Sequence, residues 1–171
     1  IGGYVAGSAD VIHYIKHKAR SFIFSAAMPP AAAATALECL KIVQEDTSQL
    51  ERLWRNARTM NQGLCRMGYN TLNSRTPIIP LVIGDDDTAF QFSQKLYEEG
   101  VFATPVVRPA VRKGCALIRT SYMATHTNED LEYALNTLET LGKEFGIIGK
   151  RGRRQKLAVL ETPHSRIPRV A

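Results

Sequence analysis

The spacing of apolar and polar positions changes character about 75 residues into the chain. Before that point apolar residues recur at helical spacing, which predicts helices over residues 8–19, 31–45 and 48–68. A Ser-Gln-Leu-Glu capping box opens the third of these helices, and Gly68 is expected to end it. Between the first two helices, residues 21–25 (Ser-Phe-Ile-Phe-Ser) are extended in character, which favours a strand.

From residue 76 onward, short apolar runs alternate with segments of helical periodicity. Strands are predicted for the runs that are bounded by turn formers: 77–84, 101–107 and 116–122. Helices are expected at about 88–99, after three aspartates, and after the Thr-Asn-Glu-Asp cap at 127–130. The last two strands are joined by a short link and should pair antiparallel. The predicted fold class is α/β, with an α+β unit in which two helices cover a small antiparallel sheet.

These patterns divide the 171 residues into four parts. Residues 1–45 are expected to end a larger domain, because their strand and helices need packing partners that the chain does not contain. Residues 46–75 are expected to be a long connecting helix, and residues 76–149 the small α+β domain. Residues 150–171 form a basic tail that is expected to be flexible.

Composition and charge exclude several classes of protein. Apolar residues make up 44% and charged residues 22% of the chain, which excludes a wholly disordered or collagen-like protein. The net charge of +6 is confined to the tail, because residues 1–149 carry 15 charges of each sign. A nucleic-acid interface would depend on the cluster at 150–156 alone, so no nucleic-acid partner is expected. On charge alone, that cluster suits acidic lipids at the inner membrane surface.

The cysteines and histidines form no pattern that predicts a metal site. The three cysteines lie far apart and make no CxxC pair, which predicts free thiols in a reducing cytoplasm. His13 and His17 share a helix face, but no third ligand is near them in the sequence. Solvated histidines are therefore favoured over a zinc site.

Two residues are candidates for ligand binding. Ser25 ends an apolar segment just before a proline-capped helix, where a hydroxyl and backbone N–H groups suit a phosphate. A turn serine that caps local backbone is the alternative. Arg119 lies inside a predicted strand, where a permanently charged guanidinium needs a paired anion if it is buried. A bound carboxylate would supply that anion; an internal salt bridge or an outward-facing side chain are the alternatives.

Several segments of the chain resemble the α-oxoamine synthases, enzymes that depend on pyridoxal 5′-phosphate (PLP). The similarity runs in order across residues 1–149, and residues 105–111 and 121–127 are most like the bacterial serine palmitoyltransferase and aminoketobutyrate CoA ligase branch. The matching segments are Gly-Gly-Tyr-Val-Ala-Gly at 2–7, Phe-Ile-Phe-Ser-Ala-Ala-Met-Pro-Pro at 22–30, Glu-Glu-Gly-Val-Phe at 98–102, Leu-Ile-Arg-Thr-Ser at 117–121 and Ala-Thr-His-Thr at 124–127.

The resemblance implies a type I fold of PLP-dependent transferases and a homodimer with active sites at the subunit boundary. The intact protein would condense an amino acid with an acyl-CoA and release CO2. Arg119 matches the arginine that holds the amino-acid carboxylate. Ser25 and Ala26 match the pair that reaches the cofactor phosphate of the partner subunit, and because position 26 is alanine, its contact would be through the backbone.

Departures from the family pattern narrow these expectations. Ala110 stands where aminooxononanoate synthases have a substrate-contacting threonine, which argues against that activity. The loop from Arg108 to Arg119 is one residue shorter than in some serine palmitoyltransferases, so Arg108 is not equated with their second loop arginine.

The resemblance also implies that the PLP-binding lysine lies upstream of Ile1, just before the Gly-Gly-Tyr segment. Residues 1–45 would then end the large PLP-binding domain. No catalytic residue is expected in the chain, which alone should be inactive. Aminoketobutyrate CoA ligase activity, aminooxononanoate synthase activity and a non-catalytic subunit of the same fold remain the alternatives.

Overall fold

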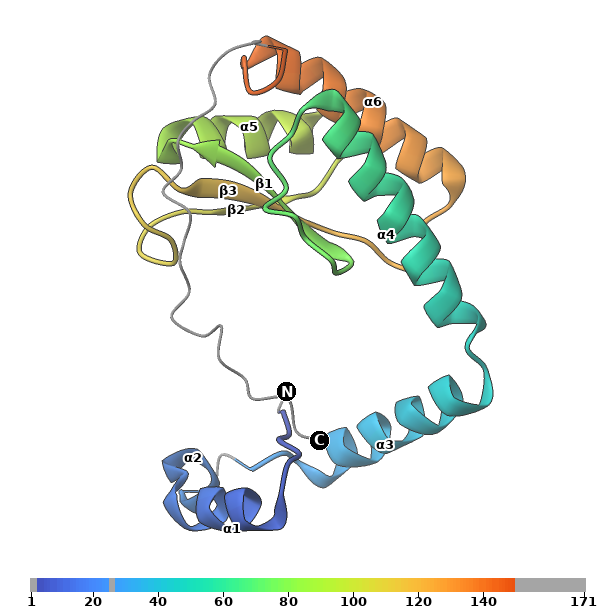
Figure 1. Cartoon of the computed structure of the whole chain (residues 1–171), viewed down its shortest axis with the longest axis vertical. Helices are drawn as coiled ribbons and strands as arrows, with labels where there is room; N and C mark the ends of the chain where they lie inside the picture. The colour runs from blue at the N-terminus through green and yellow to red at the C-terminus, as the bar shows by residue number, and fades with distance from the viewer. Residues whose placement is uncertain (1–2, 25–26, 150–171) are drawn as a thin grey trace, which may run out of the picture.

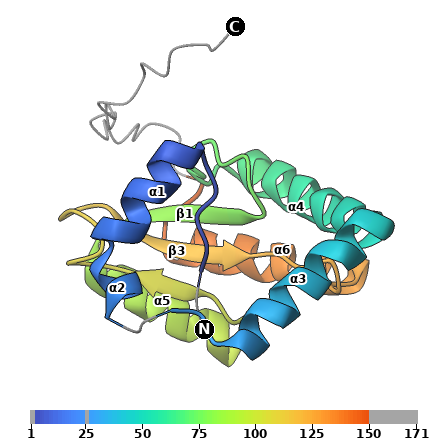
Figure 2. The same cartoon turned by 90° about the horizontal axis from the view of Figure 1, so that it is seen from below.

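A computed structural model describes residues 3–24 and 27–149. Figure 1 shows α5 and α6 on one side of a small sheet and the first three helices on the other side, apart from the strands. Figure 2, seen from below, shows α1 in front of the sheet and α6 behind it. The elements follow in the order α1 (Ala9–Lys18), α2 (Arg20–Ile23), α3 (Pro30–Glu45), α4 (Ser48–Met67), β1 (Ile78–Gly84), α5 (Asp86–Glu98), β2 (Thr104–Val106), β3 (Ala116–Ser121) and α6 (Asn128–Glu144).

The prediction of a strand at residues 21–25 is wrong for the part of that segment that the structure describes. Arg20–Ile23 forms the short helix α2, and the backbone N–H groups of Phe22 and Ile23 both donate to the carbonyl of Ala19, at 3.1 and 3.0 Å. A strand there would leave its backbone groups unpaired, because no described strand lies beside it. Local helical hydrogen bonds satisfy those groups instead.

The N-terminal contacts of the long helix α4 differ from the predicted capping box. Its N-cap is Thr47, whose hydroxyl donates to the carboxylate of Glu51 at 3.1 Å. Ser48 donates instead to Asp46, through its backbone N–H at 2.8 Å and its hydroxyl at 3.0 Å. The predicted end is confirmed, because Gly68 has a left-handed φ of 96° that suits glycine.

The three strands form an antiparallel sheet in the order β1-β3-β2. The predicted antiparallel pairing of the last two strands is confirmed, and β3 lies in the centre. The strand β2 is three residues long and contains Pro105, which fits an edge strand because proline cannot donate a ladder hydrogen bond. The strand with Arg119 is therefore held on both sides.

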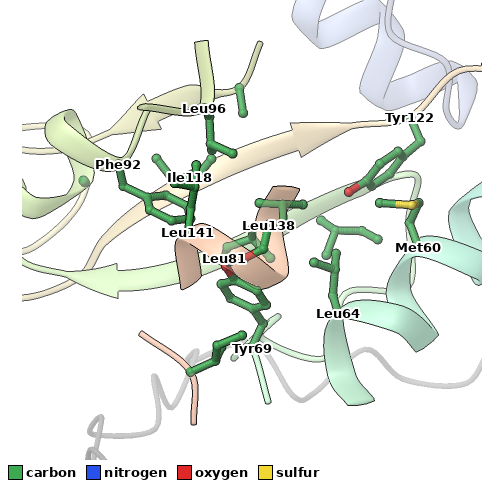
Figure 3. Close-up of a cluster of buried hydrophobic side chains, with 14 of the residues drawn as sticks. Met60, Leu64, Tyr69, Leu81, Phe92, Leu96, Ile118, Tyr122, Leu138 and Leu141 are labelled. Atoms are coloured by element: carbon green, nitrogen blue, oxygen red, sulfur yellow. Dashed lines mark hydrogen bonds between the residues drawn. The ribbon is translucent and has the colours of Figure 1, made fainter. Parts of the chain in front are cut away.

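The hydrophobic core lies between one face of this sheet and the helices (Figure 3). Each fully buried large apolar side chain contributes roughly 1.5–3 kcal/mol relative to exposure. The predicted cap of α6 is confirmed, because Thr127 and Asp130 form a reciprocal capping box. The fully buried large apolar side chains come from β1, β3 and the helices α4, α5 and α6: Met60, Leu64, Ile79, Leu81, Phe92, Leu96, Ile118 and Leu138.

The first three helices bury no residue in the described structure. The expectation that residues 1–45 end a larger domain stays a prediction. No helix among the described residues is long and apolar enough to cross a bilayer. Large apolar side chains are exposed along this whole segment: Tyr4, Val5, Val11, Tyr14, Phe22, Ile23, Phe24, Leu37, Leu40, Ile42 and Val43.

Candidate functional site

Arg119 lies in the middle of the central strand β3. It stands opposite Pro80 of β1 and Thr104 of β2. Its neighbours Ile118 and Thr120 are buried against the helices, and successive strand residues point to opposite faces. Arg119 therefore lies on the sheet face that the core helices leave uncovered, and its side chain is exposed.

We call this surface the open face. Directly paired residues share a face, so its members follow from the register of the sheet. Arg119 is its one charged residue among the paired positions. The other members are Ile78, Pro80, Val82, Thr104, Val106, Leu117 and Ser121.

The guanidinium of Arg119 has no ion-pair partner within the part of the chain that the structure describes. The internal salt bridge weighed from the sequence is therefore not seen there, and the side chain faces outward over uncharged neighbours. A planar guanidinium with free donors can bind a carboxylate through two parallel hydrogen bonds. The open face thus offers one cation for one anionic group.

Buried polar contacts hold the C-terminal end of β3 and the turn that follows it. The Thr120 hydroxyl donates to the carbonyl of Ile79 at 2.8 Å, which ties β3 to β1. Asn56 of α4 is almost fully buried, and its amide donates to the carbonyls of Met123 and His126 at 3.0 Å each. These bonds fix the chain just after β3. Sequence reasoning missed Asn56, although an asparagine among the apolar positions of a helix is the signal that marks it.

A groove of about 690 Å3 opens beside the open face. We call it the loop groove, because most of its lining comes from the loop between β2 and β3. The basic side chains of Arg108, Arg112 and Lys113 also line it, and no acidic residue does. Its apolar walls are Leu72, Val82, Pro109, Ala110, Val111 and Leu117. Sequence reasoning did not find this groove, because its lining combines the loop with Val82 of β1 and Leu117 of β3.

An ion pair anchors this loop to the start of α5. The Arg108 Nε donates to the Asp86 carboxylate at 2.6 Å, and this hydrogen bond and charge raise the pKa of Arg108. The second oxygen of Asp86 is buried and has no hydrogen-bond partner among the described residues. Arg108 is thus already partnered, whereas Arg119 is not.

A smaller cavity of about 360 Å3 lies between the end of β3 and α6. Ser121, His126 and Asp130 line it, and these residue types form hydrolytic triads in other proteins. Here the Asp130 carboxylate accepts the backbone N–H of Thr127 at 2.8 Å, and this bond lowers its pKa. The His126 Nδ1 accepts the backbone N–H of Met123 at 3.3 Å. Both side chains already accept hydrogen bonds from backbone N–H groups of the turn before α6. This cavity is therefore a poorer candidate for a functional site than the open face.

The remaining sequence candidates contribute no described site. Ser25 and Ala26, expected to reach a phosphate, lie outside the described residues. The Nδ1 atom of the exposed His17 lies 2.8 Å from the carbonyl oxygen of His13. No group of three or more metal-ligating side chains gathers in residues 3–24 and 27–149.

Comparisons with known proteins show which family the chain belongs to. The chain matches the family described as aminotransferase class I and II over residues 1–138. It is 51% identical over 147 residues to the serine palmitoyltransferase of Bacteriovorax stolpii, covering 86% of this chain and 35% of that protein. It is 44% identical over 148 residues to the 8-amino-7-oxononanoate synthase of Treponema denticola, covering 86% of this chain and 38% of that protein.

Solved structures show the same similarity. The serine palmitoyltransferase of Sphingomonas wittichii matches with a TM-score of 0.71 and 29% identity, over 84% of this chain and 37% of that one. A high-resolution structure of SPT with PLP matches with a TM-score of 0.71 and 27% identity, over 84% of this chain and 36% of that one. The chain thus spans about a third of the length of the relatives it matches. The fold of the chain is that of the matching third of a type I PLP-dependent enzyme. The chain belongs to the class I and II aminotransferase family, and α-oxoamine synthases are among its relatives.

Proposed function

We propose that this chain is the C-terminal part of a PLP-dependent acyltransferase that condenses an amino acid with an acyl-CoA and releases CO2. The observation that carries the proposal is the place of Arg119, a cation without an ion-pair partner among the described residues, at the centre of the open face. The relatives named serine palmitoyltransferase and 8-amino-7-oxononanoate synthase support the reaction class.

The open face fits an amino-acid substrate bound beside PLP. No carboxylate of the described residues competes for Arg119, so the donors of its guanidinium remain available to a ligand. PLP, when bound, supplies an electron sink that stabilises negative charge at the α-carbon of an amino acid. From this chain, Ser25 and Ala26 are the residues that we propose reach the phosphate of the PLP bound to the partner subunit.

Arg119 has a binding and an orienting role in this proposal. A two-point contact with the carboxylate fixes the direction of the bond from that group to the α-carbon. Asn56 and Thr120 keep the backbone of β3 in place, so Arg119 extends from a fixed position on the strand. The carboxylate leaves as CO2, so the product lacks the group that Arg119 holds. We therefore expect the product to bind less tightly than the amino acid.

The finer activity that we propose is that of a serine palmitoyltransferase. The chain shares 51% identity with the enzyme of Bacteriovorax stolpii, against 44% with the oxononanoate synthase of Treponema denticola. Ala110 in place of a threonine, which argues against the oxononanoate synthases, points the same way. Serine and a long-chain acyl-CoA are the substrates that follow.

We further propose a homodimer in which residues 1–45 belong to the large PLP-binding domain and residues 76–149 form the small domain. The exposed apolar side chains of α1–α3 support this assembly, because burying them against a neighbour is favourable. The three free thiols fit a reducing, cytoplasmic location.

The test is an amino-acid scan with the intact protein loaded with PLP. Serine is expected to change the absorbance of the bound cofactor, and ethanolamine, which lacks the carboxylate, is the matched control that should not. Release of CO2 on addition of palmitoyl-CoA would complete the reaction. If no amino acid alters the spectrum, the enzyme proposal fails, and a non-catalytic subunit of the same fold takes its place.

A further inference from the structure

A further cavity, of about 370 Å3, lies between α4 and the segment that leads from it into β1. We call it the helix cavity. Figure 1 shows the chain turning back at the end of α4 and running beside that helix toward β1. Its lining contains two arginines and a tryptophan but no acidic residue: Trp54, Ala57, Arg58, Asn61, Gln62, Ser74, Arg75 and Thr76.

Hydrogen bonds hold the two walls of the helix cavity together. The Asn61 amide of α4 donates to the carbonyl of Ser74 at 2.9 Å. The hydroxyls of Ser74 and Thr76 both donate to the carbonyl of Ile78, at 2.7 and 2.9 Å. The backbone that carries Arg75 is therefore fixed against α4, which carries Arg58.

The charge in and around the helix cavity is positive. Arg58 and Arg75 are exposed and form no ion pair within the described residues. The single acid of α4, Glu51, accepts the hydroxyl of Thr47 at 3.1 Å. Two guanidiniums that line one cavity are suited to a group with two negative charges, such as a phosphate, because each offers several donors to its oxygens. The helix carries three more arginines, which add to the positive field: Arg52, Arg55 and Arg66.

Trp54 adds a flat apolar surface to this cationic cavity. Its indole lines the cavity and is 37% exposed. Trp54 and Arg58 are four residues apart on α4, so they lie on the same side of the helix. Planar rings stack on exposed indoles, and a purine is a fused two-ring system of similar size. A phosphate joined to a purine would use both the arginines and the tryptophan.

We propose that the helix cavity binds a purine nucleotide, with its phosphate on Arg58 and Arg75 and its base against Trp54. The cavity shares no residue with the open face. This site is therefore additional to the proposed amino-acid site, and neither proposal depends on the other.

The test measures equilibrium binding of AMP to the intact protein, loaded with PLP, by calorimetry at low salt. Arg58→Ala/Arg75→Ala should weaken AMP binding about 10-fold or more, as expected for lost charge-assisted contacts. Arg52→Ala/Arg66→Ala removes the same charge from exposed positions outside the cavity and is the matched control that should bind nearly as the parent does. Circular dichroism checks that both variants keep the fold.

A second variant tests the stacking of the base. Trp54→Leu keeps an apolar side chain without the flat ring, so it should weaken AMP binding about 5-fold or more and leave the binding of inorganic phosphate unchanged. Adenosine, which lacks the phosphate, should bind the parent less tightly than AMP.

Three results would overturn the inference. They are a parent that does not bind AMP, AMP binding that survives in the Arg58/Arg75 variant, and an equal loss in both double variants, which would indicate a general attraction to the basic helix. The serine-dependent absorbance change tests the proposed function separately. Its absence from a parent that binds AMP at the helix cavity would refute the proposed function and support the nucleotide site.

Discussion

Gly142 is the position where one added methyl group should disturb the core most. A Cβ there would collide with the hydroxyl of Tyr69 and would lie 2.9 Å from its Cζ and 3.1 Å from Ile148 Cδ1. The Tyr69 hydroxyl is fixed, because it donates to the carbonyl of Leu138 at 2.7 Å in a buried setting. Neither the ring nor the helix can yield without losing that bond.

The expected loss of stability follows from three contributions. Overpacking a close-packed core costs about 2 kcal/mol, and loss of the Tyr69 hydrogen bond costs about 1 kcal/mol. Alanine is a better helix former than glycine by about 1 kcal/mol, which offsets part of the cost. Gly142→Ala should therefore lower the free energy of unfolding by about 2 kcal/mol, measured by urea titration followed by circular dichroism.

Two further variants make this prediction specific. Gly63→Ala would place its Cβ 2.7 Å from Leu135 Cδ2, the far end of a half-buried side chain that can move, so we expect little change or a small gain. Tyr69→Phe removes the colliding hydroxyl, so Gly142→Ala should cost less than half as much in that background. A Gly142→Ala protein as stable as the parent would refute the reasoning.

Two other predictions concern buried polar groups. Asn56→Ala leaves two carbonyls without their donor and should lower the free energy of unfolding by about 2–4 kcal/mol in urea titrations. Asn61→Ala loses a half-buried bond to the Ser74 carbonyl and an exposed one from the Cys65 thiol, and should cost about 1 kcal/mol. Equal costs for the two variants would contradict the assignment. Burial raises the pKa of Tyr122 to about 12, so its neutral form favours folding and stability should fall as pH rises from 10 toward 12. Tyr122→Phe should make this loss of stability at high pH smaller. It should leave the free energy of unfolding at pH 7 unchanged, because the hydroxyl has no hydrogen-bond partner in the described residues. An unchanged loss of stability between pH 10 and pH 12 in this variant would contradict the prediction.

Local patterns predicted the secondary structure from residue 76 onward because each element there has its own signal. The Thr127 cap of α6, the aspartates at the start of α5 and the β-branched residues of the strands all act within a few residues. The strand expected at residues 21–25 was wrong because a short apolar run does not distinguish a strand from a helix, and the described part of the chain has no strand beside it.

The candidate site was predictable only in part, for a related reason. Arg119 stands out in the sequence as a charge inside an apolar strand, and the sheet places it on the open face. The loop groove brings Leu72 and Val82 next to residues 108–113, which the sequence separates by more than 25 positions. Tertiary packing brings these residues together, so the local spacing of residues in the sequence does not predict the groove.

The most direct measurement is the amino-acid KM of an Arg119→Ala variant of the intact protein, with Arg112→Ala as the matched loss of a cation outside the open face. Losing a charge-assisted two-point contact should raise the KM for serine about 10- to 100-fold in Arg119→Ala and leave it unchanged in Arg112→Ala. A serine KM in Arg119→Ala equal to that of the parent would contradict the assignment of this guanidinium to the substrate carboxylate.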